Sequence, residues 1–220
     1  MNDRRLIWFF ALLIPVIVWS WIAPHDRLTW WLEAGPVVVA AVLIVVLRTR
    51  FALSTLLLVL AWVHCVVLLV GAHYTYALVP AFEWLREVTD GTRNNYDKLG
   101  HFVQGLVPAI LTREILLRTS PLRDRGDGRA SRWLGFVVVS VCLAFSAFYE
   151  LIEWLVALLS GEEAESFLGT QGYVWDTQSD MAWALGGAIC ALVLLARLHD
   201  HSLAKVLARA TGVKQVEVFP

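Results

Sequence analysis

Six apolar stretches, each long enough to cross a membrane as a helix, constrain the fold of this 220-residue chain more than any other feature. About 20 apolar residues in a helix cross the roughly 30 Å hydrocarbon core of a bilayer. The expected spans are Leu6–Ala23, Thr29–Leu47, Phe51–Tyr74, Leu99–Leu117, Trp133–Leu159 and Met181–Leu198. We therefore predict an all-α polytopic membrane protein, with one integral membrane domain over residues 1–220, six transmembrane helices and a tail over residues 199–220.

The composition agrees with this fold class and excludes others. Hydrophobic residues make up 58% of the chain and charged residues 17%, and the mean hydropathy is +0.63, so there are too few polar side chains to cover a soluble domain. Cys65, Cys142 and Cys190 lie in apolar runs without paired spacing, which predicts neither a disulfide framework nor a zinc ribbon. The net charge is −1 and the basic residues are dispersed between spans, so we expect no nucleic-acid partner.

The basic residues between the spans predict the orientation of the chain. Cytoplasmic loops carry an excess of lysine and arginine. The loops on one side hold Arg4, Arg5, Arg48, Arg50, Arg118, Arg123, Arg125, Arg129, Arg132, Arg197, Lys205, Arg209 and Lys214, whereas those on the other hold only Arg27, Arg86, Arg93 and Lys98. We expect both termini in the cytoplasm and most of the acidic residues, including Glu162, Glu163 and Glu165, at the outer face.

Two glutamates, Glu150 and Glu153, lie inside the predicted fifth span. A carboxylate in hydrocarbon is costly and is rarely tolerated without a partner, so an intramembrane acid suggests a functional site. At positions i and i+3 of a helix, the two side chains point the same way.

Two further polar groups are expected at the outer ends of neighbouring spans. Helical spacing places Asp97 and His101 on one stripe at the start of the fourth span, together with Gln104 or Gly105. Asp176 and Asp180 are one turn apart where the sixth span begins. Glu150 lies about 15 Å below the outer end of its helix, so it meets these residues only if that helix projects beyond the hydrocarbon or a polar cavity enters the outer leaflet. We expect such a cavity.

The charge balance of this pocket predicts a bound cation. Five carboxylates would face one fixed cation, Lys98, and one titratable group, His101. Such an excess of negative charge requires protons or a metal ion. Imidazole and carboxylate ligands suit zinc, iron or manganese, and an oxygen-only subset would suit magnesium. The predicted metal ligands are Asp97, His101, Glu150, Glu153, Asp176 and Asp180, and the predicted catalytic residues are Lys98, Glu150 and Glu153. We predict no organic cofactor.

A purely structural explanation of the same residues remains open. Asp97 and Asp176 lie where helices begin, and carboxylates there cap free backbone N–H groups. Lys98 and one acid would form a structural ion pair, and Glu150 and Glu153 would share protons or hydrogen-bond to neighbouring side chains. His64 and His73 are expected to be core or interface residues.

Three motifs resemble a known family of bacterial inner-membrane proteins. They are Asp97-Lys98-x-x-His101-Phe102, Phe148-Tyr149-Glu150-x-x-Glu153-Trp154 and Gly169-Thr170-Gln171-Gly172-x-x-Trp175-Asp176-Thr177-Gln178-x-Asp180-Met181. In these the chain resembles the YjdF-like proteins, and the start of the fourth span is more remotely similar to the VanZ-like proteins. The resemblance implies a location in the bacterial plasma membrane and supplies no established reaction.

Two classes of function remain open from the sequence. The first is a metal-dependent hydrolase or transferase that acts at the outer leaflet on a lipid or a lipid-linked envelope substrate, with Lys98 holding an anionic group. The second is a proton-coupled transport protein or a small-ligand or lipid-binding protein without catalysis, in which Glu150 and Glu153 take up protons. We expect membrane lipids and a lipid-linked or anionic substrate as partners.

Overall fold

The computed structural model describes residues 4–123, 131–160 and 170–211, and over these ranges the chain is helical and has no strand. The long helices are α1 (Arg4–Trp21), α2 (Arg27–Leu47), α3 (Thr55–Tyr74), α5 (Tyr96–Thr119), α6 (Arg132–Ser160), α8 (Asp176–Cys190) and α9 (Ala196–Thr211). Shorter elements are η1 (Tyr76–Leu78), α4 (Pro80–Val88), η2 (Pro121–Arg123) and η4 (Ala191–Leu195). The predicted all-α membrane fold is confirmed, while the predicted loop acids Glu162, Glu163 and Glu165 lie outside the described residues.

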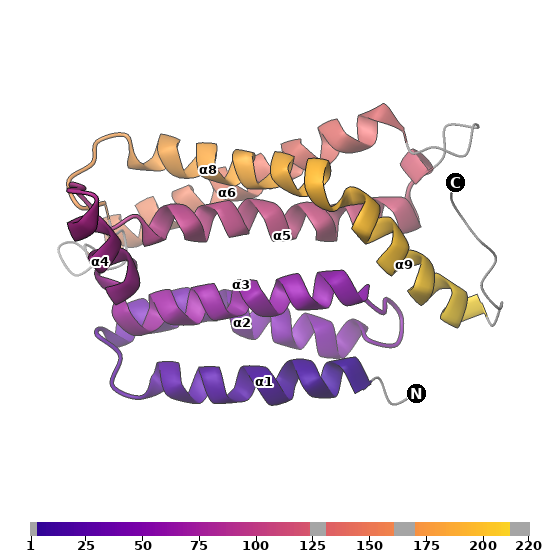
Figure 1. The fold of residues 1–220 in the computed structure, drawn as a ribbon, viewed down its shortest axis with the longest axis horizontal. Coiled ribbons are helices and arrows are strands. Elements are labelled where there is room, and N and C mark those ends of the chain that lie inside the picture. Colours follow the sequence, from indigo (N-terminus) through magenta and orange to yellow (C-terminus); the bar gives the residue numbers. More distant parts are fainter. Residues whose placement is uncertain (1–3, 124–130, 161–169, 212–220) are drawn as a thin grey trace.

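The long helices run roughly parallel or antiparallel in two groups (Figure 1). In one group α1 and α2 pack on α3, and in the other α6 and α8 pack on α5, while α3 and α5 join the groups. Helix α4 lies across one end of the bundle, where α5 begins; we call this the α4 end. The first group has a core that includes Leu13, Trp30, Val37 and Leu69, and the second has a core that includes Val103, Ile110, Val138 and Ala188.

Among the described residues, five helical stretches are long and apolar enough to cross a membrane: α1, α2, α3, α6 and the continuous run Asp176–Ala208. The predicted fourth span, Leu99–Leu117, lies within α5, which is less apolar because it carries His101, Gln104, Arg113 and Glu114. All four of these side chains are buried. A central helix of a membrane bundle can carry polar residues when they face its neighbours.

Side-chain caps define where α2 and α3 begin. Asp26 accepts a hydrogen bond from the Thr29 backbone N–H at 2.6 Å, and Ser54 caps α3 by accepting from the Leu57 N–H at 3.3 Å. These bonds satisfy N–H groups that have no partner within the first turn. The hydrogen bond from Thr29 lowers the pKa of Asp26.

Helices α5 and α8 touch through their backbones at two glycines. A Cβ atom on Gly105 would overlap the Ala184 carbonyl, and one on Gly187 would overlap the Phe102 carbonyl. Small residues permit this approach of membrane helices. Gly186, the residue before Gly187, has open space beside it. The Gly105 and Gly187 contacts hold the first turns of α5 and α8 beside each other.

The predicted sixth span does not end as a helix at Leu198. A π-helical turn, η4, links α8 to α9, and the helix continues through the described residues to Thr211. Such turns are a recognised cause of helix bends. Figure 1 shows α9 slanting from the α8 layer toward α3, where the Ser202 hydroxyl accepts a hydrogen bond from the Leu56 N–H at 3.0 Å.

Candidate functional site

Two loops are clamped together just before α5 and α8 begin. The Asn94 backbone N–H donates to Gln171 Oε1, and Gln171 Nε2 donates to the Asn94 carbonyl, both at 2.9 Å. Asn94 Nδ2 also donates to the Val79 carbonyl beside α4 at 3.0 Å. The clamp lies just before α5 and α8 begin, and the glycine contacts lie further along the same helices. The first turns of α5 and α8 are therefore held side by side, with their polar residues facing each other.

An ion-pair network connects these two turns. Lys98 Nζ lies 2.7 Å from Asp176 Oδ1 and 2.5 Å from Asp180 Oδ1. Arg93 Nη1 lies 2.6 Å from Asp176 Oδ1, and Arg93 Nη2 lies 3.5 Å from Asp97 Oδ2. The expectation of a single fixed cation was wrong, because Arg93 in the preceding loop supplies a second.

His101 lies at the centre of the network. Its Nδ1 is 2.9 Å from Gln104 Oε1, which can only accept, so Nδ1 carries the proton in this arrangement. The other nitrogen, Nε2, faces Asp97 Oδ1 at 3.3 Å and Asp180 Oδ2 at 3.9 Å. A lone pair between two carboxylates is repulsive, so a cation belongs at this point: a proton on Nε2 or a metal ion.

The donor atoms of Asp97, His101 and Asp180 fit a small cation. One ligand atom from each residue lies within 4.8 Å of the others, and all three side chains are buried. Asp97 Oδ2 accepts no hydrogen bond among the described residues. Because neutral imidazole and carboxylate ligands together suit zinc, iron and manganese, the chemistry of this set fits a divalent metal.

Glu150 of α6 reaches the same site, and Glu153 does not join the network directly. Glu150 Oε1 lies 3.9 Å from His101 Nδ1 and, among the described residues, has no hydrogen-bond partner. Glu153 is partly buried one turn further on and lines the adjoining cavity. The fixed charges in contact are thus the acids Asp97, Asp176 and Asp180 against the cations Arg93 and Lys98, with Glu150 as a further acid beside His101. This leaves an excess of negative charge.

Glu33 of α2 is a site residue that the sequence reasoning missed. Its side chain is only 4% exposed, and it lines the same cavity as Asp97 and His101. Its place within an apolar span was a signal of the same kind as that of Glu150, since both are intramembrane acids. Arg93 gave no comparable signal, because a charged residue in a loop is ordinary.

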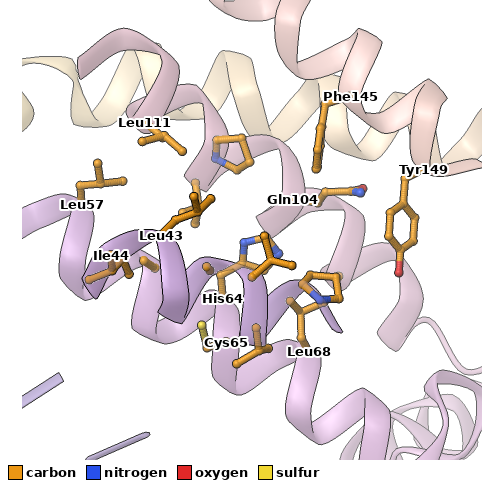
Figure 2. Close-up of a pocket in the computed structure, with 18 of the residues that line it drawn as sticks. Leu43, Ile44, Leu57, His64, Cys65, Leu68, Gln104, Leu111, Phe145 and Tyr149 are labelled. Atoms are coloured by element: carbon orange, nitrogen blue, oxygen red, sulfur yellow. The ribbon is translucent and has the colours of Figure 1, made fainter. Parts of the chain in front are cut away.

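A long cavity opens beside the site. It has a volume of about 950 Å³ and lies between α2 and α3 on one side and α5 and α6 on the other. Figure 2 shows Gln104 and Tyr149 projecting toward one part of it, with His64, Leu43 and Leu111 along its walls. Asp97, His101, Glu33 and Glu153 line it as well. The candidate metal ligands Asp97 and His101 are therefore reachable from this cavity.

A second polar cluster lies at the opposite end of α5. Glu114 is completely buried and accepts hydrogen bonds from the Ser54 N–H at 3.0 Å, from Arg118 Nη1 at 3.2 Å and from His199 Nε2 at 3.0 Å. Arg113 Nη1 lies 2.7 Å from His199 Nδ1, so this imidazole bridges Arg113 and Glu114. This cluster joins α3, α5 and α9, and its satisfied, enclosed groups indicate a structural role.

The structure therefore brings together most of the residues expected at the site. Asp97, Lys98, His101, Asp176 and Asp180 lie in one connected network, with Glu150 beside it. These helices form a membrane protein with a buried site of acids and one histidine.

Comparison with known proteins agrees with that class. Residues 5–201 match the family described as predicted membrane protein DUF2238, and the chain belongs to this family. It is 46% identical to the inner membrane protein YjdF of Escherichia coli strain K12 over 191 residues, which cover 87% of this chain and 88% of that protein. No solved structure matches the chain. The YjdF-like resemblance is confirmed, and the similarity to VanZ-like proteins stays a prediction.

Proposed function

We propose that this protein is a metal-dependent hydrolase or transferase that acts on a lipid or lipid-linked substrate. The observation that carries the proposal is the position of His101 Nε2, which faces the Asp97 and Asp180 carboxylates at 3.3 and 3.9 Å. The basic loops favour cytoplasmic termini, which would place the site at the outer side of the bacterial plasma membrane.

Asp97, His101 and Asp180 would hold the ion, which would be zinc, iron, manganese or magnesium. Gln104 fixes the orientation of the imidazole through Nδ1, as a partner of a metal-bound histidine commonly does. A bound divalent ion would polarise a phosphoryl or acyl oxygen and lower the pKa of a bound water.

The surrounding side chains have distinct roles in this proposal. Glu150, with an oxygen that makes no hydrogen bond among the described residues, would accept a proton from the attacking water or hydroxyl group. Lys98 donates to Asp176 and Asp180 and lies 3.6 Å from Asp97 Oδ2, and an anionic substrate group would take the place of this longest contact. Glu153, at the cavity wall, would assist proton transfer from the substrate side.

Proton-coupled transport or ligand binding is a second candidate, favoured by one further observation. His64 lies in the cavity wall on α3 and has no hydrogen-bond partner among the described residues, while Glu33 and Glu153 line the same cavity. A proton on His101 Nε2 would then replace the metal. A proton-linked flux into liposomes that is abolished by Glu150→Gln would support this candidate over the enzyme.

Metal analysis of the purified full chain tests the proposal. We expect about one zinc, iron, manganese or magnesium ion per chain in the unaltered protein, and its loss in His101→Ala. His201→Ala is the matched control, because His201 is an exposed residue of α9, which lies at the end of the bundle opposite α4 (Figure 1), and its loss should leave the metal in place. Thermal unfolding confirms that each variant is folded. A folded, unaltered protein without any stoichiometric divalent metal would sink the proposal.

A further inference from the structure

The cavity beside the site is larger than the proposed reaction requires. At about 950 Å³ it is near the upper limit for small-molecule pockets, which range from roughly 300 to 1,000 Å³. Its α4 end is acidic, where Glu33, Asp97 and Glu153 line it beside His101, and Arg50 and Thr119 line its opposite end; most of the wall between them is formed by aliphatic and aromatic side chains. The reacting group would occupy the acidic end, so the apolar length needs a different explanation.

The cavity has an apolar rim at the depth of the membrane. Val39 and Leu43 of α2 line it and are 59% and 51% exposed, and Phe145 and Phe148 of α6 line it and are 48% and 59% exposed. Both helices are apolar enough to cross a membrane, so these side chains would face the hydrocarbon of the bilayer. Apolar cavities do not hold ordered water. The apolar rim and walls would therefore admit a hydrocarbon chain from the bilayer.

The length of the cavity distinguishes between kinds of hydrocarbon chain. Its lining residues run from Glu33 to Leu47 on α2 and from Asp97 to Thr119 on α5. At 1.5 Å per residue these stretches are about 21 Å and about 33 Å long. One leaflet of the hydrocarbon core is about 15 Å deep, so a phospholipid acyl chain would fill less than the whole length.

We infer that the cavity binds the single long chain of a polyprenyl phosphate, which enters sideways between α2 and α6 and places its polar end beside His101. The inference deepens the proposed function and rests on it at one point, since a phosphate beside Asp97 needs the bound metal to offset the acids. The apolar part of the inference rests only on the length, lining and rim of the cavity.

Native mass spectrometry of the full chain in detergent micelles tests this assignment with defined lipids. The probes are a long-chain polyprenyl phosphate, farnesyl phosphate, the long-chain polyprenol without phosphate, and phosphatidylglycerol. We expect one long-chain polyprenyl phosphate per chain and at least tenfold weaker binding of farnesyl phosphate. Phosphatidylglycerol should not displace the long chain. Equal affinity for the long and short prenyl phosphates, or displacement by phosphatidylglycerol, overturns the inference.

Two matched pairs of variants locate the binding. Val39→Trp and Leu43→Trp fill the cavity, whereas Val38→Trp and Val42→Trp add the same ring at neighbouring exposed positions that do not line it. We expect the first two to weaken long-chain binding at least tenfold and the second two to leave it unchanged. If the cavity-filling and the control substitutions weaken long-chain binding equally, the lipid binds elsewhere and the proposed site is refuted. The presence of two independent filling positions keeps the test valid if one variant fails to fold.

The result for binding of the hydrocarbon chain is separable from the result for binding of the metal. Binding of the long-chain polyprenol to a protein without metal, with phosphatidylglycerol unable to displace it, retains the cavity assignment and removes the proposed reaction. If the protein holds a stoichiometric metal but binds the long and short prenyl phosphates equally, the proposed reaction is retained and the cavity assignment is removed.

Discussion

Replacing Glu114 with alanine tests how far the buried polar cluster at the far end of α5 stabilises the fold. Glu114 has no exposed surface and accepts from the Ser54 N–H, Arg118 and His199. Alanine removes every one of these acceptors. Arg118 keeps a hydrogen bond to the Ala52 carbonyl at 2.9 Å, so the Ser54 N–H and His199 Nε2 are the donors most affected by loss of the acceptor.

The expected cost follows from these unpaired groups. Each buried donor without a partner costs about 1–3 kcal/mol, and breaking a buried charged pair costs about 3–5 kcal/mol. We expect Glu114→Ala to lower the free energy of unfolding by about 3–5 kcal/mol. For a chain of this size, about 2–4 °C is lost per kcal/mol, which gives a fall in Tm on the order of 10 °C.

Thermal unfolding in detergent, followed by circular dichroism, measures the effect. Glu87→Ala is the matched control, because Glu87 is an exposed glutamate on α4 and its removal should change stability by no more than about 0.5 kcal/mol. A Glu114→Ala protein as stable as the Glu87→Ala control would refute the reasoning, because it would show that the buried hydrogen bonds contribute nothing net.

Four other substitutions have defined expectations. Gly187→Ala should lower the free energy of unfolding by about 1–3 kcal/mol, because its Cβ would overlap the backbone of α5. Gly186→Ala, with open space beside it, should be neutral or stabilising. Equal effects of the two substitutions in thermal unfolding would contradict the contact between α5 and α8. Asp26→Ala should cost about 1 kcal/mol. Because the folded pKa of Asp26 is lowered, this stabilisation is present above its ordinary value of 3.8 and is lost as the pH falls through the folded value; an acid titration of stability that is identical in the variant would contradict the cap. Gln104→Leu should weaken metal binding about 10- to 100-fold by releasing His101, and an unchanged affinity in isothermal titration would remove Gln104 from the site.

The helices and the central residues of the site could be predicted from the sequence because their signals are local. Apolar runs near 20 residues predict spans, and the spacing of Asp97 and His101 places them on one helical stripe. Asp180 could be added because it starts a span at the same predicted face. Glu150 could be located within its span but at a depth that conflicted with the other residues, and the structure resolves this conflict by bringing its carboxylate within 3.9 Å of His101.

The remaining residues depend on tertiary packing that no local pattern specifies. Glu33 is near the site because α2 packs on α3 and faces α5 across the cavity, and no spacing within α2 encodes that neighbour. Arg93 contributes because the Asn94–Gln171 clamp brings its loop over α8. No proline or glycine within Ala191–Leu195 predicts the bend at η4, so the sequence alone did not indicate it.

The identity of the cation on His101 Nε2 is the central question. NMR of protein labelled with ¹⁵N in its histidines measures it directly, and His101→Asn assigns the signal. On titration of the metal-stripped protein with zinc, we predict that the Nε2 resonance of His101 changes to that of a metal-bound nitrogen and saturates at one ion per chain, while Nδ1 remains protonated. An Nε2 that stays protonated and insensitive to zinc, manganese and magnesium would contradict the account and leave a proton as the cation between Asp97 and Asp180.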